Sequence, residues 1–332
     1  MIVNVPNGSD NKNVLWHVND EVKVKIEDLG VPMPSDITII YDIIYFKGKY
    51  HMLGEDSNTT YVWVYDDNVW TKYETGMNSL CTYAQLIEYK NKLYCTLEAD
   101  NSAVSFKVFD ENYEVSSVHS RTGGSKLRIE VAKDEENDLL YIVTADSGAS
   151  AKMYYVTFDG TTVSSEIDIT SGKLTLLGAH IKDSYICIYY QDGTVYKFNR
   201  THLGDTSNKK TEILTNARRY KYINNRVYGY VNDAAYNKVY KVSSTETEDV
   251  IAHDILGLGH AHENGILAVY SEKWSMTEAS ISIIKEYKEA TATLEKSTKL
   301  TVDNAFPISD NLKVTEGGYV VSETGEVKIG IY

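Results

Sequence analysis

The chain has 332 residues, and its 33 lysine and arginine residues stand against 47 aspartate and glutamate residues, giving a formal net charge of −14 at pH 7. This acidic balance argues against nucleic acid or an anionic membrane surface as a partner, because both would need the opposite sign. The chain has no apolar run of the roughly 18 residues that a membrane-spanning helix needs, and no signal-peptide pattern at its start. We therefore expect synthesis in the cytoplasm, without membrane insertion.

Near the N-terminus, residues 14–26 have the pattern of a β-hairpin, with alternating apolar and polar residues on either side of Asn19 and Asp20. The same pattern recurs at residues 63–73, where we predict the third and fourth strands of a sheet. Pro32 and Pro34 mark a bridge into the first complete sheet. We expect the N-terminal hairpin to complete the last sheet of the chain.

Residues 84–118 show most clearly the unit from which the chain is built. Strand patterns at residues 85–89, 93–97 and 104–109 are separated by a polar turn at residues 90–92, a polar loop, and a tight turn at residues 110–112 that leads into a fourth strand. This order predicts one four-stranded antiparallel sheet.

The unit repeats along the chain about every 45 residues, a period typical of four-stranded repeats. Small, apolar or aromatic residues stand two and four positions after each first turn, as Leu93 and Cys95 do after Asn91. Because alternate residues of a strand share one face, we expect this column to face a neighbouring sheet in every copy. The corresponding turn residues are Gly48, Asn91, Asn137, Asp183, Asn225, Asn264 and Gly317.

The third strand of each unit is also recognisable, and several of these strands run into Asp- or Asn-containing turns. Residues 284–297, the stretch with the highest helix propensity, read better as strand, turn and strand, because no segment sustains a period of 3.6 residues. The predicted third strands are residues 61–65, 104–109, 153–158, 194–198, 238–242 and 281–284.

This pattern resembles the β-propeller superfold. The resemblance implies an all-β chain of seven four-stranded antiparallel blades, closed by the N-terminal strands that complete the C-terminal blade. Residues 1–332 would form a single domain, with blades at residues 35–78, 80–120, 126–171, 174–216, 218–254 and 257–300, and a last blade of residues 304–332 with 13–28. The repeated kelch, WD and sialidase signatures are missing, and the fold by itself implies no function.

The three cysteines cannot all pair with one another. Cys95 and Cys187 fall inside predicted strands at equivalent positions of their units, which favours a role as small buried hydrophobic residues. We expect free thiols in a reducing compartment.

Candidate metal ligands are sparse. His260 and His262 would share one face of a strand near His253, but no cysteine or well-spaced carboxylate completes a site. Residues 134–138 are acidic but lack the glycine and the ligand spacing of a calcium loop. We therefore predict no metal and no cofactor.

Catalytic signatures are also missing from the sequence. It contains no Gly-x-Ser-x-Gly elbow, no phosphate-binding P-loop and no dinucleotide glycine fingerprint. Carboxylate pairs for glycoside hydrolysis cannot be selected among 47 acidic residues, because their separation is a property of the folded chain. The sequence predicts no catalytic residues, and we expect the protein not to be an enzyme.

Aromatic residues are in surplus, with 27 tyrosines and four tryptophans. Most alternate within strands, where they pack. Tyr236 and Trp274 fall in expected loops between second and third strands, where an aromatic ring is freer to bind a ligand. We predict these two residues as binding residues.

Three functions remain open from the sequence. The acidic composition, rich in Asn, Lys, Ile and Tyr, is similar to that of phage tail and baseplate accessory proteins, which implies a structural or interaction subunit of a multiprotein assembly, such as a tail fibre, carried in a virion or a phage-tail-like particle. The alternative is a propeller that recognises carbohydrate on a cell surface through its loop aromatics. The second alternative is a glycoside-active enzyme with carboxylates near the propeller axis.

Overall fold

The computed structural model describes residues 14–19, 25–32, 34–77, 80–99, 103–123, 127–146, 152–169, 176–182, 184–190 and 194–199, and from residue 209 onward the strands given below. Every regular element among these residues is a β-strand. Within this described part there is no helix with the length and apolar character needed to cross a membrane.

The strands form four-stranded antiparallel sheets, as the repeating unit predicts. In most sheets, strands that follow one another in the chain are also neighbours in the sheet. These sheets are β3 (Ile39–Phe46), β4 (Lys49–Asp56), β5 (Thr59–Asp66), β6 (Val69–Met77); β7 (Cys81–Tyr89), β8 (Lys92–Ala99), β9 (Ala103–Phe109), β10 (Val115–Thr122); β11 (Arg128–Asp134), β12 (Leu139–Ala145), β13 (Met153–Phe158), β14 (Ile167–Asp168); β15 (Leu176–Lys182), β16 (Tyr185–Tyr190), β17 (Thr194–Asn199), β18 (Lys209–Glu212); β19 (Ala217–Ile223), β20 (Arg226–Asn232), β21 (Asn237–Val242), β22 (Glu248–His253); and β23 (Gly257–Ala261), β24 (Ile266–Tyr270), β25 (Ser282–Lys288), β26 (Thr293–Leu300).

One further sheet combines the two ends of the chain in the order β2-β1-β28-β27. Its strands are β1 (Val14–Asn19), β2 (Lys25–Pro32), β27 (Leu312–Val314) and β28 (Tyr319–Ser322). An N-terminal hairpin is therefore present, but its second strand is Lys25–Pro32 and not the predicted stretch that ends at residue 26, so it includes Pro32, which was predicted to lie in a bridge. Strand β1 pairs with β28 at Trp16↔Val320 and His17↔Tyr319.

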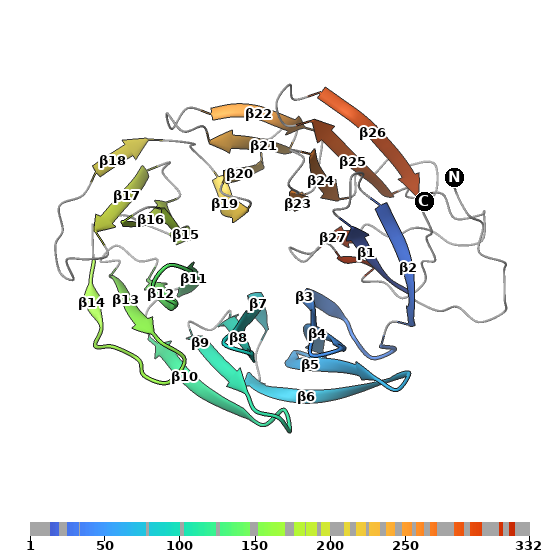
Figure 1. The fold of residues 1–332 in the computed structure, drawn as a ribbon, viewed down its shortest axis with the longest axis horizontal. Coiled ribbons are helices and arrows are strands. Elements are labelled where there is room, and N and C mark those ends of the chain that lie inside the picture. The colour runs from blue at the N-terminus through green and yellow to red at the C-terminus, as the bar shows by residue number, and fades with distance from the viewer. Residues whose placement is uncertain are drawn as a thin grey trace.

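The sheets have a propeller-like arrangement (Figure 1). The first strand of each complete sheet, for example β3, β7 and β11, lies nearest the centre, and the fourth strand, for example β6 and β10, lies at the periphery. The β3–β6, β7–β10 and β11–β14 sheets carry buried apolar residues on both faces, so neighbouring sheets must cover them. This confirms the all-β, four-strand prediction at the level of the fold.

Apolar residues fill the spaces between adjacent sheets. One cluster joins Phe46 and Leu53 of the β3–β6 sheet to Leu86 and Leu97 of the β7–β10 sheet. Equivalent clusters join the β7–β10 sheet to the β11–β14 sheet and the β11–β14 sheet to the β15–β18 sheet. The core is therefore divided into layers between sheets, each of which depends on both neighbours.

The predicted column of residues after each first turn has one orientation in the β3–β6 and β7–β10 sheets and another in the β11–β14 sheet. Cys95 packs toward the preceding sheet, whereas Tyr141, its predicted equivalent, packs toward the following sheet. The reason is the turn length: Tyr89 pairs with Lys92 across two residues, but the turn between β11 and β12 takes four. The side chains of the strand that follows are therefore shifted by one position.

The fourth sheet shows the same shift for a different reason. Lys182 pairs with Tyr185 as Tyr89 pairs with Lys92, so the pair that closes the hairpin stands one residue later relative to the predicted turn position than in the second sheet. Ile186 consequently faces the preceding sheet, in place of the expected Cys187. Cys187 is nevertheless buried, as are Cys81 and Cys95, and none of these three cysteines forms a disulfide bond.

Buried carboxylates connect adjacent sheets through backbone groups. Glu55 accepts a hydrogen bond from the backbone N–H of Cys81 at 2.6 Å, and Glu98 accepts one from the backbone N–H of Ile129 at 2.9 Å. Both glutamates stand at the same position of the repeat, at the end of the second strand. A carboxylate that accepts a backbone donor of the next sheet compensates part of its own desolvation cost.

Candidate functional site

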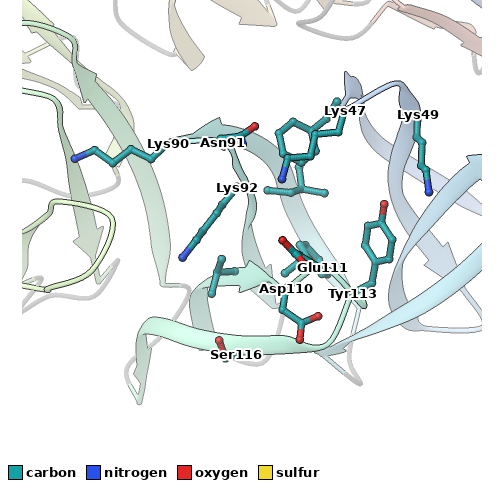
Figure 2. Close-up of a pocket in the computed structure, with 13 residues that line it drawn as sticks. Lys47, Lys49, Lys90, Asn91, Lys92, Asp110, Glu111, Tyr113 and Ser116 are labelled. Carbon is teal, nitrogen blue, oxygen red and sulfur yellow. The ribbon is translucent and has the colours of Figure 1, made fainter.

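The β3–β6 and β7–β10 sheets enclose a pocket of about 700 Å³ at the end where their first turns lie. Lys47 and Lys49 line it from one sheet and Lys90 and Lys92 from the other, and Figure 2 shows that the Lys90 side chain extends away from the other labelled residues. The lining residues come from the first turns of both sheets and from the β9–β10 segment. They are Phe46, Lys47, Lys49, Lys90, Asn91, Lys92, Leu93, Val108, Phe109, Asp110, Glu111, Tyr113 and Ser116.

The four lysines line the same pocket because they occupy equivalent positions of consecutive repeats. Lys47 and Lys49 flank Gly48, and Lys90 and Lys92 flank Asn91, so each pair brackets the same turn position in consecutive units. Adjacent sheets bring these turns side by side.

The two turns require positive φ angles at both central residues. Lys47 has φ 48° and Lys90 has φ 47°, followed by Gly48 at 81° and Asn91 at 58°. Type I′ hairpin turns prefer Asn, Asp or Gly at these places, and a lysine in this region costs on the order of 1 kcal/mol. Such local strain is often retained where a side chain serves a function.

Two of the four lysines have partners. Lys49 Nζ lies 2.6 Å from Asp66 Oδ2, and Lys90 Nζ lies 2.8 Å from Asp138 Oδ2. Hydrogen bonds to these carboxylates raise the pKa of both amines above its ordinary value.

The other two lysines keep their charge available to a ligand. Among the residues that the structure describes, no carboxylate forms an ion pair with Lys47 or Lys92. Lys47 Nζ instead lies 5.2 Å from the centre of the Phe46 ring, and Lys92 is exposed. The pocket therefore offers two lysine amines without a carboxylate partner in the described part of the chain, in a lining that also contains Asp110 and Glu111.

The β9–β10 segment contributes acceptors to the rim. Asp110 Oδ1 accepts the backbone N–H groups of Asn112 and Glu114, both at 2.8 Å, and this shapes the turn. Glu111 is exposed at the pocket. Glu111 is thus available to accept hydrogen bonds from a ligand, whereas Asp110 mainly holds the loop.

Tyr113 forms one wall of the pocket and is held from behind. Its ring stacks on Tyr73 at a centroid distance of 4.6 Å, and its hydroxyl lies 2.9 Å from Nε2 of His51. His51 is fully buried, and burial lowers its pKa to about 4. The histidine is therefore neutral near pH 7.

This arrangement can bind a small anion-bearing molecule. Its volume lies in the range of about 300 to 1,000 Å³ that is common for small-molecule sites. Phe46, Leu93 and Phe109 provide an apolar floor, and the polar groups stand around it.

The predicted binding residues Tyr236 and Trp274 lie outside the described residues, as does His262. His253 and His260 are placed as strand residues of β22 and β23. Within the described part of the chain, no three His, Cys, Asp or Glu side chains gather as metal ligands.

The acidic turn at residues 134–138 has a structural role in its own hairpin. The Asp134 carboxylate accepts hydrogen bonds from the backbone N and the side-chain Nδ2 of Asn137, at 3.1 and 2.9 Å.

The lysine pocket was missed by sequence reasoning, although a signal was present. Lys-Gly-Lys at residues 47–49 and Lys-Asn-Lys at residues 90–92 stand at the same place in consecutive repeats. Once adjacent repeats are taken as adjacent sheets, identical charged positions predict a shared patch. The contribution of Tyr113 and Glu111 depends on how the β9–β10 loop folds back, which no local pattern indicates.

No family model matches the chain, and no curated protein matches its sequence. Solved structures do match its fold. An oligogalacturonate lyase in complex with manganese has a TM-score of 0.56 and 10% identity, over 93% of this chain and 89% of that chain. A candidate 6-phosphogluconolactonase from Bacteroides uniformis ATCC 8492 has a TM-score of 0.54 and 10% identity, over 89% of this chain and 98% of that chain.

These comparisons support a propeller-like fold and contradict the prediction that the chain is not an enzyme. Both structural neighbours are named as enzymes, although 10% identity shows the shared fold alone. The prediction of a non-enzyme was wrong because it was drawn from the absence of linear catalytic motifs. In a fold of this kind a site is assembled from separate strands and loops, so that a missing motif does not exclude catalysis.

Proposed function

We propose that this protein binds an anionic carbohydrate in the lysine pocket between the β3–β6 and β7–β10 sheets. The observation that carries the proposal is the presence of Lys47 and Lys92, two lysines without a carboxylate partner among the described residues, in the lining of a cavity of about 700 Å³ in a chain with a net charge of −14. These two lysine amines can attract a negatively charged ligand and hold it near the other polar groups of the lining.

The mixture of donors and acceptors favours a sugar acid over a simple anion. Lys47 and Lys92 can pair with a carboxylate or phosphate, while Glu111 and the Asn91 amide can bond to hydroxyl groups. Phe46 and Phe109 in the lining offer apolar surface to the C–H groups of a sugar ring. A bare inorganic anion would use the lysines and leave the other groups without a partner.

The names of the structural neighbours are compatible with this ligand class. One acts on an oligogalacturonate and the other is named for a phosphogluconolactone, so both names contain an acidic sugar. The proposal nevertheless rests on the lysines, because likeness at 10% identity supports only the fold.

Isothermal titration with oligogalacturonate, and with neutral galactose oligomers of the same length, tests the proposal. We expect binding of the charged oligomer only, weakened about 5- to 10-fold by Lys92→Gln and reduced further by added salt. Lys133→Gln is the matched control, because Lys133 is an exposed lysine on β11, outside the pocket lining. Equal binding of both oligomers, or equal effects of the two substitutions, would refute the proposal. Mass spectrometry of the recovered oligomer would reveal any conversion.

We also propose that the chain is a single domain, a seven-bladed propeller in which β1 and β2 complete the blade of β27 and β28. The pairing of β1 with β28 supports this, as does the position of β27 beside β23 and β24 and of β28 beside β3. Removal of residues 1–32 would expose the β28 edge. We expect a lower melting temperature and self-association of the truncated chain, and an unchanged monomer would contradict ring closure.

The earlier expectations of a role in a phage-like assembly and of cytoplasmic synthesis stay predictions. Copurification of the full chain with proteins encoded beside it would test the assembly role. An assembly role is compatible with sugar binding, since receptor recognition would require both.

A further inference from the structure

The hydrogen bonds of His51 determine what Tyr113 can offer to the pocket. The His51 ring lies between Phe46 and Tyr113, at centroid distances of 5.7 and 5.5 Å. Its Nδ1 lies 3.1 Å from the backbone oxygen of Lys49, and its Nε2 lies 2.9 Å from the Tyr113 hydroxyl. Both ring nitrogens therefore have a partner, and the ring is fixed on two sides.

The positions of the protons follow from these partners. A backbone oxygen can only accept, so Nδ1 must carry a hydrogen and donate it to Lys49. A neutral imidazole has a single N–H, which leaves Nε2 as an acceptor. The ring is neutral because burial disfavours its charged form. The Tyr113 O–H therefore donates to Nε2.

We propose that Tyr113 is a specificity-determining residue of the lysine pocket that selects anions carrying a hydroxyl group. Its own proton is directed to His51, so its oxygen can only accept a hydrogen bond from a ligand. This inference rests on the proposed function and narrows it to hydroxy acids such as uronates. An ionised carboxylate or phosphate group without a neighbouring hydroxyl cannot form a hydrogen bond with Tyr113, because both oxygens are acceptors.

The neighbouring residues support Tyr113 as an acceptor and the lysines as donors. Tyr113 stacks on Tyr73 with an interplanar angle of 30°, which holds the phenol in place. Lys47 and Lys92 supply donors for the charged group of the ligand at the same pocket. A hydroxy acid would meet donors and an acceptor at the same time, without a rearrangement of the wall.

Binding of two ligands with three carboxylates each tests the selection. Trigalacturonate carries hydroxyl groups, whereas tricarballylate carries none. We expect Tyr113→Phe to weaken trigalacturonate binding about 5- to 10-fold and to change tricarballylate binding less than about 2-fold. Lys92→Gln serves as the comparison and should weaken both. A Tyr113→Phe variant that affects both ligands equally, or neither, overturns the inference.

Nitrogen-15 NMR of histidine-labelled, ligand-free protein provides a second test, because it shows which ring nitrogen of His51 carries the hydrogen. We expect His51 to be protonated at Nδ1 and unprotonated at Nε2, with the signal assigned by its loss in His51→Gln. A hydrogen on Nε2 overturns the inference. If the unmodified protein does not bind trigalacturonate at all, the proposed function fails as well. Binding without selective loss in Tyr113→Phe refutes the inference alone.

Discussion

Glu98 provides a direct test of how one sheet is joined to the next. Its carboxylate is fully buried at the end of β8 and accepts two hydrogen bonds from β11, one from the backbone N–H of Ile129 at 2.9 Å and one from Arg128 at 2.6 Å. Glu98→Ala would leave the Ile129 donor buried without an acceptor and Arg128 without its carboxylate.

The cost can be estimated from these two contacts. An unsatisfied buried backbone donor costs about 1 to 3 kcal/mol, and a lost hydrogen bond to a charged group costs about 1.5 to 3 kcal/mol. The Arg128 side chain is 32% exposed, so water replaces part of its lost partner and the lower ends of both ranges apply. We expect Glu98→Ala to reduce the unfolding free energy by about 3 kcal/mol. Glu98→Gln keeps an acceptor for Ile129 and should cost about half as much.

Urea unfolding followed by tryptophan fluorescence measures these changes, with buried Trp63 as a reporter. Glu88→Ala is the matched control, because Glu88 is an exposed glutamate on the neighbouring strand β7 and should change stability by less than about 0.5 kcal/mol. Hydrogen exchange should also show faster exchange of the Ile129 amide in Glu98→Ala. If Glu98→Ala and Glu88→Ala unfold at the same urea concentration, the assigned role of the carboxylate is wrong.

Three further predictions concern other parts of the structure. Lys47→Asn should raise the unfolding free energy by about 0.5 to 1 kcal/mol, because asparagine tolerates φ 48° better than lysine, while weakening anion binding in the titration. The pKa of His51 is lowered to about 4 from its ordinary 6.5, so the unfolded chain binds this proton more readily. The contribution of His51 to the unfolding free energy is therefore present above about pH 6.5 and is lost as the pH falls toward 4, by up to about 3 kcal/mol. His51→Gln should make the unfolding free energy less dependent on pH in this range. Burial raises the pKa of Cys95 to about 12 and that of Cys81 to about 11, so a thiol reagent at pH 8 should react with the unfolded chain and not with the native protein. Fast labelling of the native protein would contradict the buried positions, and a flat or inverted pH dependence would contradict the role of His51.

The repeat could be recognised from sequence because strand patterns and turns are local. Alternation at residues 93–97 and the turn at Lys90 and Asn91 report on a few neighbouring residues, and the same signals recur in each unit. The hairpin of β1 and β2 was predicted on the same basis. Where the prediction of facing residues was wrong, as for Tyr141, the cause was a longer turn, whose extra residues shift every following side chain.

The lysine pocket shows the limit of such reasoning. Its turns carry a visible charge pattern, but Tyr113 reaches His51 across 62 residues, and neither residue is near the other in any local signal. The inter-sheet bonds of Glu55 and Glu98 are also long-range, and the sequence shows them only as two acids within strands.

Local alternation and turn chemistry thus determined that this chain forms four-stranded antiparallel sheets in a regular succession, because each strand needs only its hairpin neighbours to pair. Only the tertiary structure decided which side chains of different sheets meet. Those meetings depend on the length of each turn and on the packing of each sheet against the next. Lys47 and Lys92 line one pocket, and the Tyr113 hydroxyl meets His51, only because two sheets lie side by side.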